Sequence, residues 1–357
     1  MAPLDRRGAA FPRRVNAEIA ELGWPLRLEK LAGRGFGLVA SRALPSGSVV
    51  ALERPLVLSV SCAHTRTRCA FCLATPRAAE WELRCTCAAL YFCSAACQRG
   101  AEASALHSAA ECAALSSFLR TAARDPLADL VVQAIRILCH REAGRCVRPW
   151  DGSPLELGYS SYTERLCGFE RSRRSEETLR RAARRALEAV PPSARVPLAE
   201  LVAVLNHHQA NVYGVLGPRA QEIALSSFVG LFQLFNHSCI PNLVFDCCPR
   251  PADGASEALS TTVPPRFALV TLRDIAAGEE LCHCYAGSAD STSVRREYLL
   301  LHHGFECDCS RCAESDIGVE MDIAERLDGI RCRIPECGTG LGYQDWEPAD
   351  DELHGLE

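Results

Sequence analysis

The sequence predicts an α+β fold in which a mainly β core of short strands is interrupted by a metal-binding insert and a helical insert. Three observations support this prediction. Short apolar runs with Pro and Gly turns occur in residues 26–68 and again in 206–286, residues 69–112 are rich in Cys, and residues 113–205 are rich in Ala, Leu and Arg. A second Cys-rich segment, residues 287–315, follows the core, and residues 316–357 form a short tail.

The composition is that of an ordinary globular protein, with one exception. Of the 357 residues, 48% are apolar and 23% are charged, and the net charge of −5 gives no reason to expect direct nucleic-acid binding. The sequence has no apolar run of 18 residues, and its N-terminus lacks the apolar region of a secretory signal. The exception is the count of 21 Cys, which without such a signal predicts metal sites in a reducing compartment. We therefore expect the protein in the cytoplasm and nucleus and not at a membrane; a short organellar transit peptide is the alternative.

Residues 26–68 and 206–286 carry the strand signals. Residues 26–68 alternate apolar and polar side chains, and Pro45 and Gly47 mark a turn between strands. Later in the chain, residues 267–272 are a clear strand and residues 278–281 are a turn that enters another. Residues 248–266, rich in Pro, Gly, Ser and Thr, are expected to form a surface loop.

Residues 113–205 are predicted to be helical, and one helix is well marked. Ser175 suits an N-cap, and the acidic residues after it suit the first turn because they interact favourably with the helix dipole. The apolar stripe of this helix is formed by Leu179, Ala183, Ala186, Leu187 and Val190. Pro191 and Pro192 then end the helix.

Residues 69–112 contain ligands for two tetrahedral zinc ions. Seven Cys and one His occur in closely spaced pairs: Cys69, Cys72, Cys85, Cys87, Cys93, Cys97, His107 and Cys112. Zinc favours thiolate and imidazole ligands, and short spacings allow both members of a pair to reach one ion. The segment is also too poor in large apolar residues to fold without metal.

Three further thiolates occur near the end of the chain, at Cys307, Cys309 and Cys312, and a tetrahedral zinc ion needs a fourth ligand. Two other motifs precede them. One is the sequence NHSCIPN at residues 236–242, and the other is GEEL at 278–281, which is followed by Tyr285. Each motif alone is a weak signal, but their order along the chain is a strong one.

The sequence LYFCSAACQ at residues 90–98 resembles that of a MYND zinc finger. The resemblance implies two interleaved ions, one held by Cys69, Cys72, Cys93 and Cys97 and the other by Cys85, Cys87, His107 and Cys112. The spacings from Cys85 to Cys87, from Cys97 to His107 and from His107 to Cys112 depart from the family pattern and concern the second ion. A proline-rich peptide is the candidate partner that the resemblance implies for the finger.

The order of the NHSCIPN, GEEL and Cys-x-Cys-x2-Cys motifs resembles the catalytic half of SET-domain protein methyltransferases. With the inserted finger, it is similar to the SMYD family of protein-lysine methyltransferases over about residues 26–315. The resemblance implies S-adenosyl-L-methionine as cofactor, a histone or non-histone lysine as methyl acceptor, and Cys239 as the fourth ligand of a third zinc ion. It implies Tyr285 at the point of methyl transfer, with cofactor contacts from Arg34, Gly35, Phe36, Asn211 (or Asn206), Asn236, His237 and Phe305.

Two departures leave a second function open. The SMYD family commonly has Tyr at the place of His303, which lines the lysine channel, and the finger has the unusual spacings given above. The alternative is a MYND adaptor that binds proline-rich peptides while its SET domain is weakly active or inactive. A DNA-binding zinc protein is less well supported, because residues 66–112 contain five Arg and four Glu and therefore no basic face.

The tail carries a Cys pair of its own. Cys332 and Cys337 resemble half of a zinc ribbon, and residues 313–357 are too few for the helical C-terminal lobe that many SMYD proteins carry. Either the substrate cleft is open and the pair is a structural knuckle or a remnant, or the chain is truncated before the partner ligands. We expect an open cleft that accepts folded protein substrates.

Overall fold

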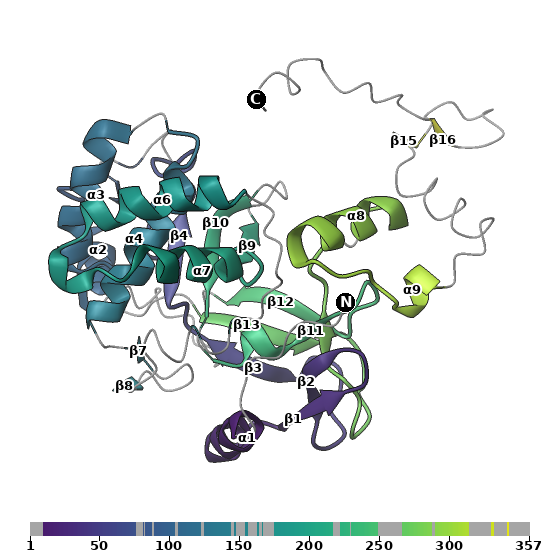
Figure 1. The fold of residues 1–357 in the computed structure, drawn as a ribbon. Coiled ribbons are helices and arrows are strands. Elements are labelled where there is room, and N and C mark those ends of the chain that lie inside the picture. Colours follow the sequence, from purple (N-terminus) through teal and green to yellow (C-terminus); the bar gives the residue numbers. More distant parts are fainter. Residues whose placement is uncertain are drawn as a thin grey trace.

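The computed structural model describes most of the chain, in four long stretches (Figure 1). These are residues 10–75, 81–143, 175–248 and 266–313, with gaps at 82, 88, 104–105, 123–124, 217–221, 229 and 288–289. Residues 146–147, 154–155, 163, 166, 330–331 and 341–342 are also described. The expected loop after Cys248, the Cys332 and Cys337 pair and any cover that the tail gives to the cleft lie outside these residues.

A strand-rich part and a helical part pack against each other (Figure 1). The strand-rich part contains β1 Leu26–Leu31, β2 Gly35–Ala40, β3 Val49–Glu53, β4 Val57–Val60, β9 Tyr213–Leu216, β10 Glu222–Ser227, β11 Asn236–His237, β12 Leu243–Cys248, β13 Arg266–Thr271 and β14 Cys282–His283, with the 3-10 turn η2 Phe232–Leu234. The helical part contains α2 Ala95–Ala103, α3 Ala109–Ala122, α4 Ala128–Ala143, α6 Glu176–Ala189, η1 Pro192–Ala194 and α7 Leu198–His208.

The remaining elements are short or terminal. The metal-binding insert contains the strand pair β5 Leu83–Arg84 and β6 Tyr91–Phe92, and a second small pair is β7 Cys146–Val147 and β8 Pro154–Leu155. Helix α1 Phe11–Leu22 precedes the strands, and α8 Thr292–His303, α9 Ser310–Ala313, β15 Ile330–Arg331 and β16 Leu341–Gly342 follow them. The predicted α+β fold of short strands with inserted zinc-type clusters is confirmed.

Strands from the beginning of the chain pair with strands from its second half. β1 and β2 form a hairpin, β3 is the edge of a sheet with the order β12-β13-β3, and β4 is the edge of a sheet with the order β4-β10-β9. The short strands β11 and β14 pair in parallel, with Asn236 opposite Cys282 and His237 opposite His283. This parallel pair places the NHSCIPN motif directly beside the residues that lead to Tyr285.

Helix α6 begins and ends where the sequence predicts. The hydroxyl of Ser175 accepts a hydrogen bond from the backbone N–H of Thr178 at 3.2 Å, which satisfies a donor that the first helical turn leaves open. Leu179, Ala183 and Ala186 are buried, as the apolar stripe requires, and the helix ends at Ala189 before the two prolines. The predicted strand at 267–272 is β13, which starts and ends one residue earlier.

Helix α1 is not predicted by the strand and Cys patterns. Its signals are nevertheless present, because Phe11, Val15 and Ile19 repeat every four residues and are all buried. Gly23 ends the helix in the left-handed conformation at φ 69°. Asn16 joins the helix to β1, since its side chain accepts from the Leu28 N–H at 2.8 Å and donates to the Leu28 carbonyl at 3.0 Å.

Helix α4 ties the helical part to strand β4. The carboxylate of Asp129 accepts a hydrogen bond from the backbone N–H of Cys62 at 2.7 Å, and the guanidinium of Arg136 donates to the carbonyl of Leu58. Two apolar cores lie on either side of this contact, one among the helices and the metal-binding insert and one among the strands. None of the described helices is long and apolar enough to cross a membrane.

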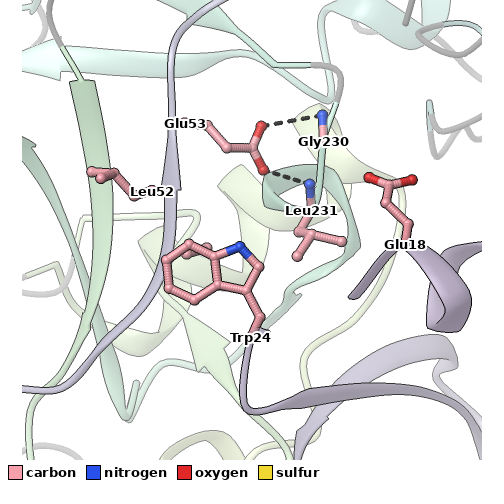
Figure 2. A pocket seen from close by; sticks show the side chains of 7 residues that line it. Glu18, Trp24, Leu52, Glu53, Gly230 and Leu231 are labelled. Atoms are coloured by element: carbon pink, nitrogen blue, oxygen red, sulfur yellow. Dashed lines mark hydrogen bonds between the residues drawn. The ribbon is translucent and has the colours of Figure 1, made fainter. Parts of the chain in front are cut away.

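Glu53, at the end of β3, is a buried carboxylate with 3% of its surface exposed. It accepts hydrogen bonds from the backbone N–H groups of Gly230 at 3.1 Å, Phe232 at 3.0 Å and Leu231, and Trp24 lies nearby in the same small pocket (Figure 2). A Cβ at position 230 would lie 2.5 Å from Oε1 of Glu53, so any larger residue there would displace this carboxylate. These amides open the turn η2, which leads into Asn236, and Glu53 therefore positions the start of the NHSCIPN motif.

Glu53→Ala is expected to destabilise the protein by about 3 kcal/mol or more, because it leaves buried N–H groups without an acceptor. The midpoint of thermal unfolding should fall by roughly 5 °C or more. Glu29→Gln is the matched control, since Glu29 forms a solvent-exposed ion pair with Arg27, and such pairs contribute little. Equal midpoints for the two variants would show that the Glu53 contacts are not stabilising.

Candidate active site and metal clusters

Tyr285 lies two residues after the end of strand β14 and is held by the segment around β11. Its hydroxyl donates a hydrogen bond to the carbonyl of Phe235 at 2.5 Å, and its backbone N–H donates to Nδ1 of His237 at 3.0 Å. Both contacts depend on the parallel pairing of β11 with β14. The side chain packs against a small buried group that contains Leu299 and the sulfur atoms of the third Cys cluster.

The ring of His237 has a partner on each nitrogen. Because Nδ1 accepts from Tyr285, the neutral imidazole carries its proton on Nε2. Nε2 lies 3.2 Å from Sγ of Cys239 and donates to it. Burial, helped by the neighbouring His283 and His303, lowers the pKa of His237 to about 3, so the ring is uncharged at neutral pH. Because both ring nitrogens already have partners, the predicted contact between His237 and the cofactor would use the face of the ring or the backbone.

Uncharged aromatic rings surround Tyr285. The ring centroids of His237, His283 and His303 lie 5.2, 4.7 and 4.8 Å from that of Tyr285, and Phe305 lies at 6.5 Å. Burial lowers the pKa of His283 to about 3 and the pKa of His303 to about 4. His303 stands where the SMYD pattern has Tyr, and its uncharged ring keeps this wall aromatic and neutral.

Tyr213 of β9 holds His283 in place. The Tyr213 hydroxyl donates to the carbonyl of Phe232 at 2.5 Å, so it accepts from Nε2–H of His283 at 3.0 Å. The two rings also stack, with centroids 5.0 Å apart and planes at 21°. Neither residue is predicted from the sequence, because single aromatic residues in short strands have no distinguishing local pattern.

A polar network lies between the β1–β2 turn and the NHSCIPN motif. The guanidinium of Arg34 donates to the carbonyl of His237 at 2.6 Å and pairs with the carboxylate of Glu280 at 3.3 Å. The amide of Asn236 donates to the same carboxylate at 2.9 Å and to the carbonyl of Phe36 at 3.3 Å. Arg34 and Glu280 keep 29% and 22% of their side-chain surface exposed, so a ligand in solvent can reach this network.

Two glycines of β2 allow the backbone to lie close to this network. Gly35 has φ 74°, a conformation that suits glycine, and a Cβ at Gly37 would lie 2.6 Å from Nδ2 of Asn236. The ring of Phe36 packs 5.9 Å from that of Phe11 on α1. Phe36 therefore offers its backbone, not its side chain, to the network.

The remaining predicted cofactor residues lie on other elements. Phe305 follows α8, with its ring 5.8 Å from that of His237. Asn211 is buried after the end of α7, where its side chain donates to the carbonyl of His207 at 2.7 Å, and the alternative, Asn206, lies within α7. The neighbouring backbone of Ala210 forms a hydrogen bond with His303, which places Asn211 close to the aromatic wall.

Besides Tyr213 and His283, two more residues of the site are missed by reasoning from the motifs. Glu280 joins Arg34 to Asn236, as described above, and its signal is the second Glu of GEEL. Asn242, the last residue of NHSCIPN, accepts from the Cys282 N–H at 2.8 Å and donates to the Glu280 carbonyl at 2.8 Å. Asn242 therefore fastens the GEEL segment to the NHSCIPN motif.

In the described part of the chain, three clusters of four side chains could each hold a metal ion, and the ligand atoms of each lie within 4.8 Å of one another: Cys69, Cys72, Cys93 and Cys97; Cys85, Cys87, His107 and Cys112; and Cys239, Cys307, Cys309 and Cys312. Zn–S bonds of about 2.3 Å place the sulfurs of a tetrahedral site about 3.8 Å apart. In the third cluster Sγ of Cys239 lies 3.8 Å from that of Cys307 and 3.6 Å from that of Cys312. The donor types and distances fit zinc.

The second cluster has a buried carboxylate behind its histidine. Nε2 of His107 lies 3.2 Å from Sγ of Cys85, and Nδ1 lies 3.0 Å from the carboxylate of Glu111. Glu111 is in turn 3.5 Å from the guanidinium of Arg136, which also reaches strand β4. Carboxylates of this kind fix the orientation of a metal-binding imidazole. The unusual spacings around His107 are thus compatible with a well-oriented ligand.

Comparisons with known proteins agree with this geometry. The SET domain family model matches residues 35–286. Histone-lysine N-methyltransferase SMYD3 of Homo sapiens is 28% identical over 308 residues, which are 83% of this chain and 64% of that protein. Histone-lysine N-methyltransferase ASHR2 of Arabidopsis thaliana is 24% identical over 350 residues, 88% and 83% of the two chains. SET domain and MYND-type zinc finger protein 6 of Schizosaccharomyces pombe is 23% identical over 315 residues, 83% and 54% of the two chains.

One solved structure with a similar course of the chain is described as the SET domain of LSMT bound to lysine and AdoHcy, with a TM-score of 0.42 and 14% identity over 83% of this chain and 57% of that one. The chain spans 64% of the length of human SMYD3. The family match covers more than half of the chain and contains the NHSCIPN motif, the GEEL motif and Tyr285. The chain therefore belongs to the SET-domain family.

Proposed function

We propose that the protein is an S-adenosylmethionine-dependent methyltransferase that acts on a protein lysine. The observation that carries the proposal is the position of Tyr285, whose hydroxyl lies 2.5 Å from the Phe235 carbonyl within a wall of uncharged aromatic rings. Relatives that are named histone-lysine N-methyltransferases support the same reaction class.

The polar network around Arg34 suits the amino-acid end of S-adenosylmethionine, which carries one carboxylate and one ammonium group. The guanidinium of Arg34 matches the carboxylate, and the carboxylate of Glu280 matches the ammonium. The ring of Phe305, which packs beside that of His237 with centroids 5.8 Å apart, suits the flat adenine ring. The residues present therefore fit this cofactor.

The aromatic wall suits the methyl acceptor. When bound, the cofactor supplies an electrophilic methyl group on a sulfonium, so the protein has mainly to position the partners, an effect that contributes about 7–11 kcal/mol. A free lysine has a pKa of about 10.4. An uncharged, buried wall lowers that pKa and so favours the neutral amine that can attack. The oxygens of Tyr285 and Phe235 are placed to accept N–H and weak C–H···O contacts.

We further propose that each of the three clusters holds one zinc ion. The first two would stabilise the finger, which has few large apolar residues of its own. The third would join the segment after α8 to Cys239 and, through His237, to Tyr285. The candidate partner of the finger is a proline-rich peptide, a proposal that rests on the resemblance of residues 90–98 to a MYND finger.

The reaction is tested by incubating the protein with labelled S-adenosylmethionine and either histones or a cell lysate, followed by mass spectrometry of labelled lysines. Labelled lysine supports the proposal. Calorimetry separates it from the alternative of an adaptor with an inactive SET domain. An adaptor of that kind would transfer no methyl group and would show little or no heat of cofactor binding.

Tyr285→Phe should reduce methyl transfer by roughly 100-fold or more while cofactor affinity stays nearly unchanged, because the hydroxyl acts at the transfer point. Transfer is measured with labelled cofactor and affinity by calorimetry. Tyr298→Phe is the matched control, since Tyr298 is 37% exposed and stacks on His302 of the same helix. Near-normal turnover of Tyr285→Phe on a validated substrate would refute its catalytic role.

Asn236→Ala should weaken cofactor binding by roughly tenfold, because it removes the amide that orients Glu280 beside Arg34. Calorimetric titration with S-adenosylmethionine measures the loss, and the thermal midpoint of the free protein monitors the fold. Unchanged affinity in a folded Asn236→Ala protein would place the cofactor elsewhere.

Elemental analysis of the purified protein should give about three zinc ions per chain, the number of clusters. Cys239→Ser should lose one ion and the activity together, because Cys239 is both a ligand and the partner of His237. Cys62→Ser is the control, since Cys62 is exposed and belongs to none of the clusters. A zinc content of one or none in the wild-type protein would contradict the assignment.

A further inference from the structure

Helix α8 buries a charged side chain completely. Arg295 is 0% exposed and is the largest of the fully buried side chains in the described part of the chain. A buried charge is strongly unfavourable unless opposite charge and hydrogen-bond partners surround it. The partners of Arg295 therefore indicate where negative charge lies in this part of the protein.

The partners are backbone, hydroxyl and sulfur atoms. One terminal nitrogen donates to Oγ1 of Thr292 at 2.8 Å and to Sγ of Cys312 at 3.7 Å, and the other donates to the carbonyl of Asp290. The sulfur of Cys239 is a further hydrogen-bond partner. Among the described residues, no carboxylate forms an ion pair with Arg295. Within the residues that the structure describes, the groups that can carry negative charge beside this guanidinium are the sulfurs of Cys239 and Cys312.

The third cluster supplies such a charge when it holds a metal. Four thiolates around one Zn²⁺ leave a net charge of about −2 on the complex. Two neighbouring arginines donate to backbone carbonyls of the same ligands, Arg296 to that of Cys312 at 2.5 Å and Arg311 to that of Cys239 at 3.5 Å. Of these three arginines, Arg295 is the one whose guanidinium donates to the sulfurs.

We infer that Arg295 is a positioning residue for the third metal site, whose guanidinium balances the charge of a zinc-tetrathiolate complex and donates to its sulfurs. The inference rests on the proposed zinc ion at Cys239, Cys307, Cys309 and Cys312. It assigns α8 a specific task. The helix carries Arg295 to the thiolates and, two turns later, His303 to the wall around Tyr285, so one rigid element joins the metal site to the substrate site.

The test is the rate at which the full-length protein releases zinc to a colorimetric chelator. Arg295→Gln should release one of about three ions roughly 10- to 100-fold faster than the wild type, which is the usual effect of losing a partner behind a metal ligand. The other ions should leave at the wild-type rate, because the partners of Arg295 include no ligand of the other two clusters. Mass spectrometry after brief iodoacetamide treatment should show faster alkylation of Cys239, Cys307, Cys309 and Cys312 alone.

Arg296→Gln is the matched control, because it removes the same charge from the next residue of α8, which is exposed and reaches a carbonyl instead of a sulfur. It should leave release and alkylation nearly unchanged. Should Arg295→Gln not fold, Arg295→Lys keeps the charge but loses the planar fork, and it should release one ion a few-fold faster than the wild type. Wild-type release and alkylation rates in Arg295→Gln, or in Arg295→Lys when Arg295→Gln is insoluble, would overturn the inference. A wild-type protein without zinc at this cluster would instead overturn the zinc proposal itself.

Discussion

The imidazole of His237 joins the two chemical centres of this protein. One ring nitrogen accepts from the backbone of Tyr285 and the other donates to the sulfur of Cys239, so a single rigid ring sets the distance between the proposed transfer point and the third cluster. The two bonds also fix the tautomer, because each nitrogen can play only one role in a neutral ring. The proposed methyl transfer needs no metal for its chemistry, yet the backbone at its transfer point is held through His237 by Cys239 of the third cluster.

The rest of the core serves to hold this arrangement from several directions. Glu53 binds the amides before the NHSCIPN motif, Asn242 binds the GEEL segment after it, and Arg34 reaches the carbonyl of His237 from the β1–β2 turn. Arg34 and Glu53 come from the beginning of the SET region and Asn242 from its last part. The inserted finger and helices contact the core through α4 and strand β4 (Figure 1), and the backbone at the end of α7 also reaches the aromatic wall.

The sequence predicts what depends on local pattern and misses what depends on distant contacts. Short spacings between ligands anticipate the pairs within the clusters, and Ser175 with the two prolines anticipates the ends of α6, because each signal lies within a few residues. Only the family resemblance predicts which pairs share an ion and that Cys239 joins the third cluster. The aromatic wall is different. His283 and Tyr213 are 70 positions apart in the chain, and the residues around each of them give no sign that the two side chains form a hydrogen bond. The burial of Arg295 is not predicted from the sequence either, since an arginine on a helix ordinarily faces solvent.

The clusters also differ in how much chain they enclose, and this difference bears on the order of folding. Sulfurs that meet in the finger are separated by 21 positions in the first cluster and 27 in the second, whereas Cys239 meets Cys307 across 68 positions. The entropy cost of closing a loop grows with its length, so the third cluster has the largest such cost of the three. On a ribosome, the finger can therefore mature while the catalytic half is still being made. Timed thiol labelling during synthesis would reveal two separate events, with the site at Tyr285 completed in the last of them.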